Sequence, residues 1–239
     1  MIGRCSVALA VGLAASSAAL RAAPVEGIAS LAQSDLVVSR ANVSESVVAL
    51  TFDDGPRDPY TAQILDVLRD HGVVATFFLI GENVVRHPML ANRIVREGHA
   101  VGNHSFSHRS LPTLADQQIR AEIERAAEAI RMATGLRPWL LRPPYGAMDS
   151  RLRGSHGIPA SGGNTVILWS VQASDWSTRS AQRVALRTLT QVRPGSIILL
   201  HDGGGSRGHV VTATRWMVAN LSRRGFRMVT VPDLLAMQR

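Results

Sequence analysis

The sequence predicts a single α/β domain whose parallel sheet closes into a barrel, and three observations support this prediction. Short apolar runs alternate with amphipathic runs over most of the 239 residues, which is the order expected of strands and helices in turn. The short runs are apolar at consecutive positions, as in strands that helices cover on both faces. About seven such units occur without a nucleotide-type glycine fingerprint, which favours a barrel over an open doubly wound sheet.

Each expected strand is a short run of apolar residues that ends at a glycine or a polar residue. The expected strands are 47–50, 73–80, 99–102, 139–141, 165–169, 196–200 and 226–231. Each expected helix carries apolar residues at helical spacing, with glycine or proline near most of its ends. The expected helices are 60–68, 88–97, 114–134, 181–192 and 211–224. In 114–134, one face carries Ile119, Ile123, Ala126, Ala127 and Ile130.

One strand–helix unit departs from this regularity. Glycine, serine and proline dominate residues 153–163, where a helix and a clean turn would be expected. Each glycine inside a helix costs roughly 1 kcal/mol. We therefore expect this part of the barrel to be shortened or loose.

The N-terminus has the pattern of a secretory signal. Arg4 precedes an apolar run at 7–15, and small residues follow at 16–19. The run is too short for a comfortable membrane span. We predict a signal peptide at 1–23, a linker at 24–45 and one domain at 46–239. A disordered or membrane-tethered N-terminus is the alternative.

Export would remove the only cysteine, Cys5, and leave a mature chain without a thiol. We expect a monomer that is secreted or held in the cell envelope, with no stable membrane insertion once the signal is removed. The formal net charge of the chain is +8, and the arginines that produce it are scattered along the sequence rather than clustered. A nucleic-acid partner is therefore not expected, whereas an anionic cell wall would suit a mildly basic surface.

The sequence Thr-Phe-Asp-Asp-Gly-Pro at 51–56 directly follows the first expected strand. Proline cannot continue a ladder, so Asp53 and Asp54 lie where a buried strand becomes a loop. In α/β sheets and barrels, chemistry is placed at this carboxyl end of the strands. Taken alone, the same residues also make an ordinary turn.

His104 and His108 follow another expected strand and lie four residues apart. If the chain is helical after Asn103, both imidazoles point the same way. Two imidazoles and one carboxylate form a three-ligand metal site with open positions, although an isolated pair at this spacing is often incidental. The same ligands occur in non-haem iron oxygenases. A second aspartate favours hydrolysis, because a metal-activated water needs a base beside it.

Three further polar residues follow expected strands: Arg142, Asp175 and His201. In a barrel they would converge with the aspartates and histidines on one face. Each also has a structural explanation, because Arg142-Pro143-Pro144 could be a rigid connector and Asp175 a helix cap.

Taken together, five ordered motifs resemble those of the polysaccharide deacetylases, the NodB-homology domains of carbohydrate esterase family 4. The motifs lie at 51–56, 104–108, 142–146, 175–176 and 199–201, and the resemblance spans about 47–235. It implies a distorted, incomplete (β/α) barrel and one divalent metal ion, with zinc expected and cobalt as an alternative. It also implies a hydrolase of carbon–nitrogen bonds other than peptide bonds, which removes N-acetyl groups from N-acetylglucosamine units and releases acetate.

The resemblance assigns Asp54, His104 and His108 as metal ligands and Asp53 as the general base. It further implies that Arg142 pairs with Asp53.

On the opposite side of the site, the resemblance implies that His201 protonates the leaving amine while Asp175 orients it. The backbone N–H of Tyr145 would bind the oxyanion, and Trp176 and Leu199 would wall the acetyl pocket. Gln172 stands where many members carry an acid, at a position that we expect to be peripheral.

The expected substrate is therefore an N-acetylated glycan, either a chitooligosaccharide or peptidoglycan. Two alternatives remain open from the sequence: an acetylxylan O-deacetylase of the same family, and a sugar-binding module without activity. We expect the remaining histidines to lie on the surface or at helix caps; they are His71, His87, His99, His156 and His209.

Overall fold

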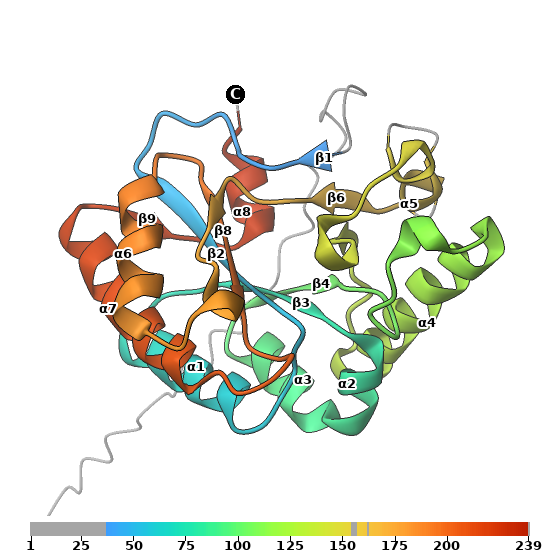
Figure 1. Ribbon diagram of the computed structural model, residues 1–239, viewed down its shortest axis with the longest axis horizontal. Helices are drawn as coiled ribbons and strands as arrows, with labels where there is room; N and C mark the ends of the chain where they lie inside the picture. The colour runs from blue at the N-terminus through green and yellow to red at the C-terminus, as the bar shows by residue number, and fades with distance from the viewer. Residues whose placement is uncertain (1–36, 154–156, 162, 239) are drawn as a thin grey trace, which may run out of the picture. The chain divides into compact units, whose positions relative to one another are not determined.

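Parallel strands form one curled sheet at the centre of the molecule (Figure 1). The computed structural model describes residues 37–153, 157–161 and 163–238. Within these residues the strands are β1 (Val37–Val38), β2 (Val47–Asp53), β3 (Thr76–Leu79), β4 (Ala100–Asn103), β5 (Leu140–Leu141), β6 (Thr165–Ile167), β7 (Val171–Gln172), β8 (Ile197–His201) and β9 (Arg227–Met228). Their order is β1-β6-β5-β4-β3-β2-β8-β7, and β9 pairs with β2.

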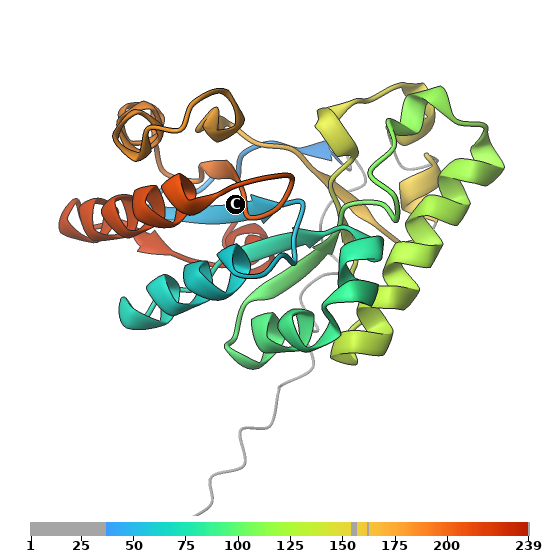
Figure 2. The same cartoon turned by 60° about the horizontal axis from the view of Figure 1, so that its bottom comes forward.

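Helices connect the strands and cover the outside of the sheet (Figures 1 and 2). They are α1 (Tyr60–Asp70), α2 (Gly81–Arg86), α3 (Pro88–Arg96), α4 (Asp116–Thr134), α5 (Ile158–Ser161), α6 (Ala181–Gln191), α7 (Gly208–Arg223) and α8 (Val231–Ala236). Helix α7 packs against both α1 and α6, and α4 packs against α2 and α3. Short 3₁₀ turns lie at Leu111–Thr113, Pro144–Gly146, Ser150–Leu152 and Asp175–Ser177.

The alternation of side chains along β2 determines what faces the inside of the curled sheet. Val48, Leu50 and Phe52 belong to the core between the sheet and helices such as α1 and α7. Val47 and Ala49 belong to a second core, inside the curl. Because successive side chains of a strand point to opposite faces, Thr51 and Asp53 continue this inner row.

Strand β8 repeats the pattern beside β2. Ile198 and Leu200 lie in the outer core, whereas Ile197 lies in the inner core. The parallel register pairs Asp53 with His201, so both inner rows reach the same end of the sheet. Helix α8 fills the opposite end, where Leu234 joins the inner core. The end of the curled sheet that carries the carboxyl ends of the strands is therefore not covered by α8, and a functional site can lie there.

One segment leads from β6, the strand next to the β1 edge of the sheet, to β7 at the opposite edge. Strand β6 pairs with β5 and β1, and only three residues separate it from β7, which pairs with β8. Between them the Leu168 N–H donates to the Val38 carbonyl (2.7 Å) and the Ser170 N–H to the Ile197 carbonyl (3.1 Å). The irregular residues at this junction and the two-residue strands beside it leave the barrel incomplete. The predicted α/β fold, a distorted and incomplete barrel, is confirmed.

The structure also differs from the expected elements in several places. Val37–Val38 form strand β1 within the stretch 24–45 that we expected to be a linker. The expected strand 226–231 is only Arg227–Met228, and helix α8 begins at Val231. Helix α2 and strand β7 had no signal strong enough to predict them. In 153–163, the described residues include the short helix α5, so this unit is indeed reduced.

The predicted signal peptide lies outside the described residues. Among the described residues, no helix has the length and apolar character needed to cross a membrane.

Candidate active site

The two adjacent aspartates occupy different positions although both lie at the end of β2. Asp53 is the last residue of the strand and belongs to its inner row. Asp54 turns away with a φ of 73°, a left-handed conformation that aspartate tolerates better than most residues. The Asn83 side chain donates to the Asp54 carbonyl (2.8 Å), and the Asp202 N–H donates to the Asp53 carbonyl (3.0 Å). These bonds hold the turn.

Arg142 lies fully buried inside the curl and binds Asp53. Its Nη1 donates to Asp53 Oδ1 and to Thr51 Oγ1, both at 2.7 Å. Its Nε and Nη2 donate to the Ile167 and Leu168 carbonyls (3.1 Å each), which lie at the junction between β6 and β7. Burial lowers the pKa of Arg142 and Asp53 opposes this effect; a guanidinium nevertheless stays charged at neutral pH. Asp53 is therefore held as an oriented, paired carboxylate.

His104 and His108 converge without a helix, contrary to the reason we gave for expecting them together. The chain after Asn103 is an irregular turn in which Ser105 and His108 have φ values of 62° and 59°. The buried Glu122 of α4 stabilises this turn by accepting from the N–H groups of Phe106 (3.0 Å) and Ser107 (2.8 Å). The turn thus replaces the expected helix as the element that brings the imidazoles together.

The structural role of Glu122 could have been predicted from the sequence. It interrupts the apolar face of α4 between Ile119 and Ile123, where an unpaired carboxylate would be costly. A carboxylate at such a position predicts a buried partner, which here is the turn that carries His108.

Asp54, His104 and His108 form the only group of described residues with a geometry suited to holding a metal ion. Their ligand atoms lie within 4.8 Å of one another. Asp54 Oδ1 is 3.4 Å from His104 Nε2 and 3.1 Å from His108 Nε2. Burial raises the pKa of Asp54, but the two neighbouring imidazoles outweigh burial and lower it well below its usual range. Asp54 is therefore an anion at neutral pH.

The tautomer of His104 fits the same conclusion. Its Nδ1 is 2.7 Å from the Arg142 carbonyl, which can only accept, so the proton lies on Nδ1. In a neutral ring the lone pair of Nε2 then faces Asp54. His104 Nε2 and Asp54 Oδ1 are then two acceptor atoms that face each other. A cation between them would stabilise this arrangement. The three residues can hold a divalent ion.

His201 and Asp175 form a buried pair on the other side of the site. His201 Nδ1 is 2.9 Å from Asp175 Oδ1, and the His201 N–H donates to Asp175 Oδ2 (3.2 Å). Burial lowers the pKa of His201, but its hydrogen bond to Asp175 and the charges of Asp175, Asp53 and Asp54 outweigh burial and raise it. His201 is therefore biased toward the imidazolium form.

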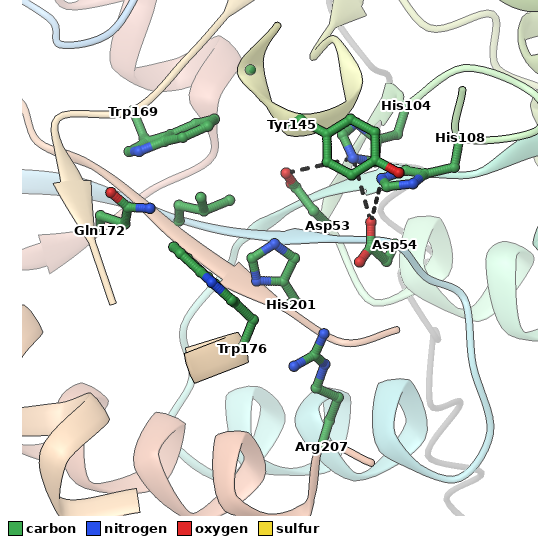
Figure 3. Close-up of a pocket in the computed structure, with 12 residues that line it drawn as sticks. Asp53, Asp54, His104, His108, Tyr145, Trp169, Gln172, Trp176, His201 and Arg207 are labelled. Atoms are coloured by element: carbon green, nitrogen blue, oxygen red, sulfur yellow. Dashed lines mark ion pairs between the residues drawn. The ribbon is translucent and has the colours of Figure 1, made fainter. Parts of the chain in front are cut away.

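A pocket of about 410 Å³ brings these groups together (Figure 3). Eight of the ten site residues predicted from the sequence line it: Asp53, Asp54, His104, His108, Tyr145, Trp176, Leu199 and His201. The other two, Arg142 and Asp175, lie directly behind Asp53 and His201. Tyr145 has a φ of 63° and its ring centroid is 4.7 Å from that of His108.

The pocket also contains residues that the sequence did not single out. Trp169 and Arg207 line it, and so does Gln172, which we expected to be peripheral.

Two histidines outside the pocket lining have contacts or burial that we did not expect. His99 is buried, which lowers its pKa to about 4, and His209 Nε2 is 2.9 Å from the Asp175 carbonyl.

Asp202 packs against the loop that follows Asp53 and Asp54. Its carboxyl is fully buried, accepts from the Thr61 hydroxyl (2.5 Å) and packs against Gly55, where an added Cβ would lie 2.2 Å from it. Burial raises the pKa of Asp202 to about 7. Only glycine fits beside this carboxyl, which explains residue 55 of the motif.

Comparison with known proteins agrees with this architecture. The family model for polysaccharide deacetylases matches residues 40–157. A peptidoglycan-N-acetylglucosamine deacetylase of Bacillus cereus is 37% identical over 195 residues, which cover 80% of this chain and 69% of that protein. A chitooligosaccharide deacetylase of Bradyrhizobium is 37% identical over 199 residues, covering 78% of this chain and 90% of the relative.

Solved structures show the same fold. The Bc1960 peptidoglycan N-acetylglucosamine deacetylase superposes with a TM-score of 0.80 and 34% identity, covering 85% of this chain and 95% of that chain. With the sequence relatives and the curled parallel sheet, this likeness leads to one conclusion: the chain belongs to the polysaccharide deacetylase family, the NodB-homology domains of carbohydrate esterase family 4.

Proposed function

We propose that this protein removes N-acetyl groups from N-acetylglucosamine units of chitooligosaccharides or peptidoglycan and releases acetate. One observation carries the proposal. Two groups suited to moving protons, Asp53 held by Arg142 at 2.7 Å and His201 held by Asp175 at 2.9 Å, line the same pocket as a three-ligand metal site. Hydrolysis of an amide needs a base for water and an acid for the amine.

Asp53 is the proposed general base. Its Oδ1 is bound by Arg142, and its Oδ2 lies on the side of His104, 3.8 Å from Nε2. It accepts a proton from the water whose oxygen attacks the acetyl carbon. A divalent ion held by Asp54, His104 and His108 would polarise the acetyl carbonyl and acidify this water.

His201 is the proposed general acid. As the carbon–nitrogen bond breaks, its Nε2 gives a proton to the leaving nitrogen, so that one water and one amide become acetate and a free amine. Asp175 holds the proton on Nδ1 and stabilises the imidazolium before transfer. The Tyr145 N–H would bind the oxyanion, and Trp176 and Leu199 would contact the acetyl methyl.

The names of the relatives favour an N-acetyl over an O-acetyl substrate, since both relatives described above act on N-acetylated glycans. The test is acetate release from chitooligosaccharides, peptidoglycan and acetylxylan side by side, with an Asp53→Asn variant as the blank. We expect release from one or both N-acetylated glycans. Release from acetylxylan alone would indicate the esterase, and glycan binding without any release would indicate the binding module.

We expect metal removal to abolish activity. Treatment with a chelator should leave less than about 1% of the rate, because both carbonyl polarisation and water activation are lost. Added Zn²⁺ or Co²⁺ should restore it, and metal analysis should find about one ion per chain, with zinc expected. His108→Ala should lower the metal content. His71→Ala should not, because His71 does not line the pocket and its Nδ1 lies 2.9 Å from the Val67 carbonyl. Full activity in a demonstrably metal-free sample would contradict the mechanism.

We further propose export from the cytoplasm, because the charged, apolar and small-residue regions of 1–23 follow the order of a secretory signal. The mature protein should begin between residues 19 and 25. N-terminal sequencing of protein from the envelope or the medium would test this, and recovery of the intact chain from cytosol alone would count against it.

A further inference from the structure

Arg207 is a buried cation in the pocket that the proposed mechanism does not use. It precedes helix α7 and is only 5% exposed, yet it contributes to the pocket wall. Its guanidinium points up from the residue before α7 toward the side of the pocket that carries His201 (Figure 3). A buried guanidinium is retained only where its surroundings compensate it, so its contacts indicate what it does.

The first set of contacts holds a glycine loop against the metal-ligand side of the site. Arg207 Nε donates to the Gly203 carbonyl (2.5 Å) and Nη2 to the Gly204 carbonyl (3.4 Å). An added Cβ on Gly203 would lie 2.1 Å from the Asp54 carbonyl, and one on Gly204 would lie 2.6 Å from Asp54 Oδ2. The loop thus packs directly on Asp54, and Arg207 fixes its carbonyls.

The second contact is with Asp175. Arg207 Nη1 lies 3.8 Å from Asp175 Oδ2, while Asp175 Oδ1 binds His201. Asp175 is fully buried, so its charge needs compensation in every state of the reaction. When His201 is neutral, Arg207 is the cation that remains beside this carboxylate.

We propose that Arg207 is a positioning residue that holds the Asp175 carboxylate and the Gly203–Gly205 loop, and through Asp175 controls proton donation by His201. This inference rests on the proposed deacetylase function, in which His201 is the acid. Arg207 is the positive charge left beside Asp175 after the imidazolium has given up its proton. Arg207 also lowers the affinity of His201 for its proton, because one positive charge disfavours the formation of a second positive charge nearby.

The charged groups around His201 determine the sign of the expected effects. Asp175, Asp53 and Asp54 favour the imidazolium. Arg207, which lies 3.8 Å from Asp175, is the cation that we infer opposes it. His209 contacts the Asp175 carbonyl. Activity that needs protonated His201 is lost as pH rises through its pKa. Replacing Arg207 by methionine should therefore move the alkaline limb of kcat to higher pH, by up to about one unit. Asp175→Asn should move it to lower pH.

The experiment compares pH profiles of kcat and KM for zinc-loaded wild type, Arg207→Met, Arg207→Lys and Asp175→Asn. Arg207→Met should also lose about tenfold or more in kcat at neutral pH with little change in KM, since proton transfer depends on orientation. Arg207→Lys keeps the charge without the bonds to the two carbonyls, so its alkaline limb should stay near that of wild type. Arg215→Met, on the exposed part of the same helix, is the control and should match wild type.

An alkaline limb that stays in place or moves to lower pH in Arg207→Met would overturn the inference, whatever the change in kcat. NMR titration of the His201 ring in the zinc-loaded proteins gives the same comparison without turnover, with His201→Gln to assign the signal. If wild type released no acetate, the proposed function would fail, yet the titration would still show whether Arg207 opposes protonation of His201.

Discussion

Asp53→Asn should lower the rate of acetate release by about 10²–10⁴, the usual contribution of a positioned acid or base, while the protein keeps its metal. Asparagine has the shape of aspartate and can still accept from Arg142 Nη1, but it cannot take a proton from water. Asp53 also lies farther from His104 Nε2 (3.8 Å) than Asp54 does (3.4 Å), and only Asp54 faces His108 as well, at 3.1 Å. The measurement is kcat together with the metal content of the purified variant.

Asp54→Asn is the matched control at the adjacent residue. It removes the carboxylate that faces both His104 and His108, so it should release metal and lose activity for that reason. Excess Zn²⁺ should restore part of the rate in this variant and none in Asp53→Asn. Normal turnover in Asp53→Asn together with full metal retention in Asp54→Asn would show that the two roles are wrongly assigned.

Arg142→Met should cost on the order of 3–5 kcal/mol of unfolding free energy, the typical effect of removing one partner of a buried ion pair. The substitution leaves Asp53 as an uncompensated carboxylate inside the curl. It also removes the donors to the Ile167 and Leu168 carbonyls at the junction of β6 and β7. Urea denaturation of the variant and wild type would measure the loss.

The double variant Asp53→Asn/Arg142→Met separates the two causes. If the unpaired charge dominates, removing the carboxylate as well should restore a large part of the lost stability. If the two carbonyls dominate, the double variant should be as unstable as Arg142→Met alone. A loss below about 1 kcal/mol in Arg142→Met would contradict the structural importance assigned to this residue.

The position of most site residues followed from the sequence because strand ends are local features. Asp53, His104, Arg142 and His201 each end or directly follow an apolar run, and parallel strands bring their carboxyl ends together. The period of two along β2 and β8 then places Asp53 and His201 on the same face. Neither step requires knowledge of distant contacts.

Other parts of the site depend on contacts that no local pattern encodes. His104 and His108 converge because Glu122, on a later helix, stabilises an irregular turn, so the helical spacing argument reached the right pair for the wrong reason. Arg207 follows three glycines with no periodic signal, and its role is visible only once Asp175 lies beside it. Strands of two residues, such as β1 and β7, are likewise defined by their partners and not by their composition.

The pairing of β2 with β8 also bears on the order in which the active site forms. The Thr51 hydroxyl binds the Ile198 carbonyl across 147 residues of chain, a contact of very high sequence separation. Such contacts form late, since a long loop must close before they contribute. The three proposed metal ligands all lie in the first half of the chain, whereas His201 comes from the last quarter. We therefore expect His201 to join the proposed ligand residues late in folding, so that catalytic competence is among the last properties that folding confers.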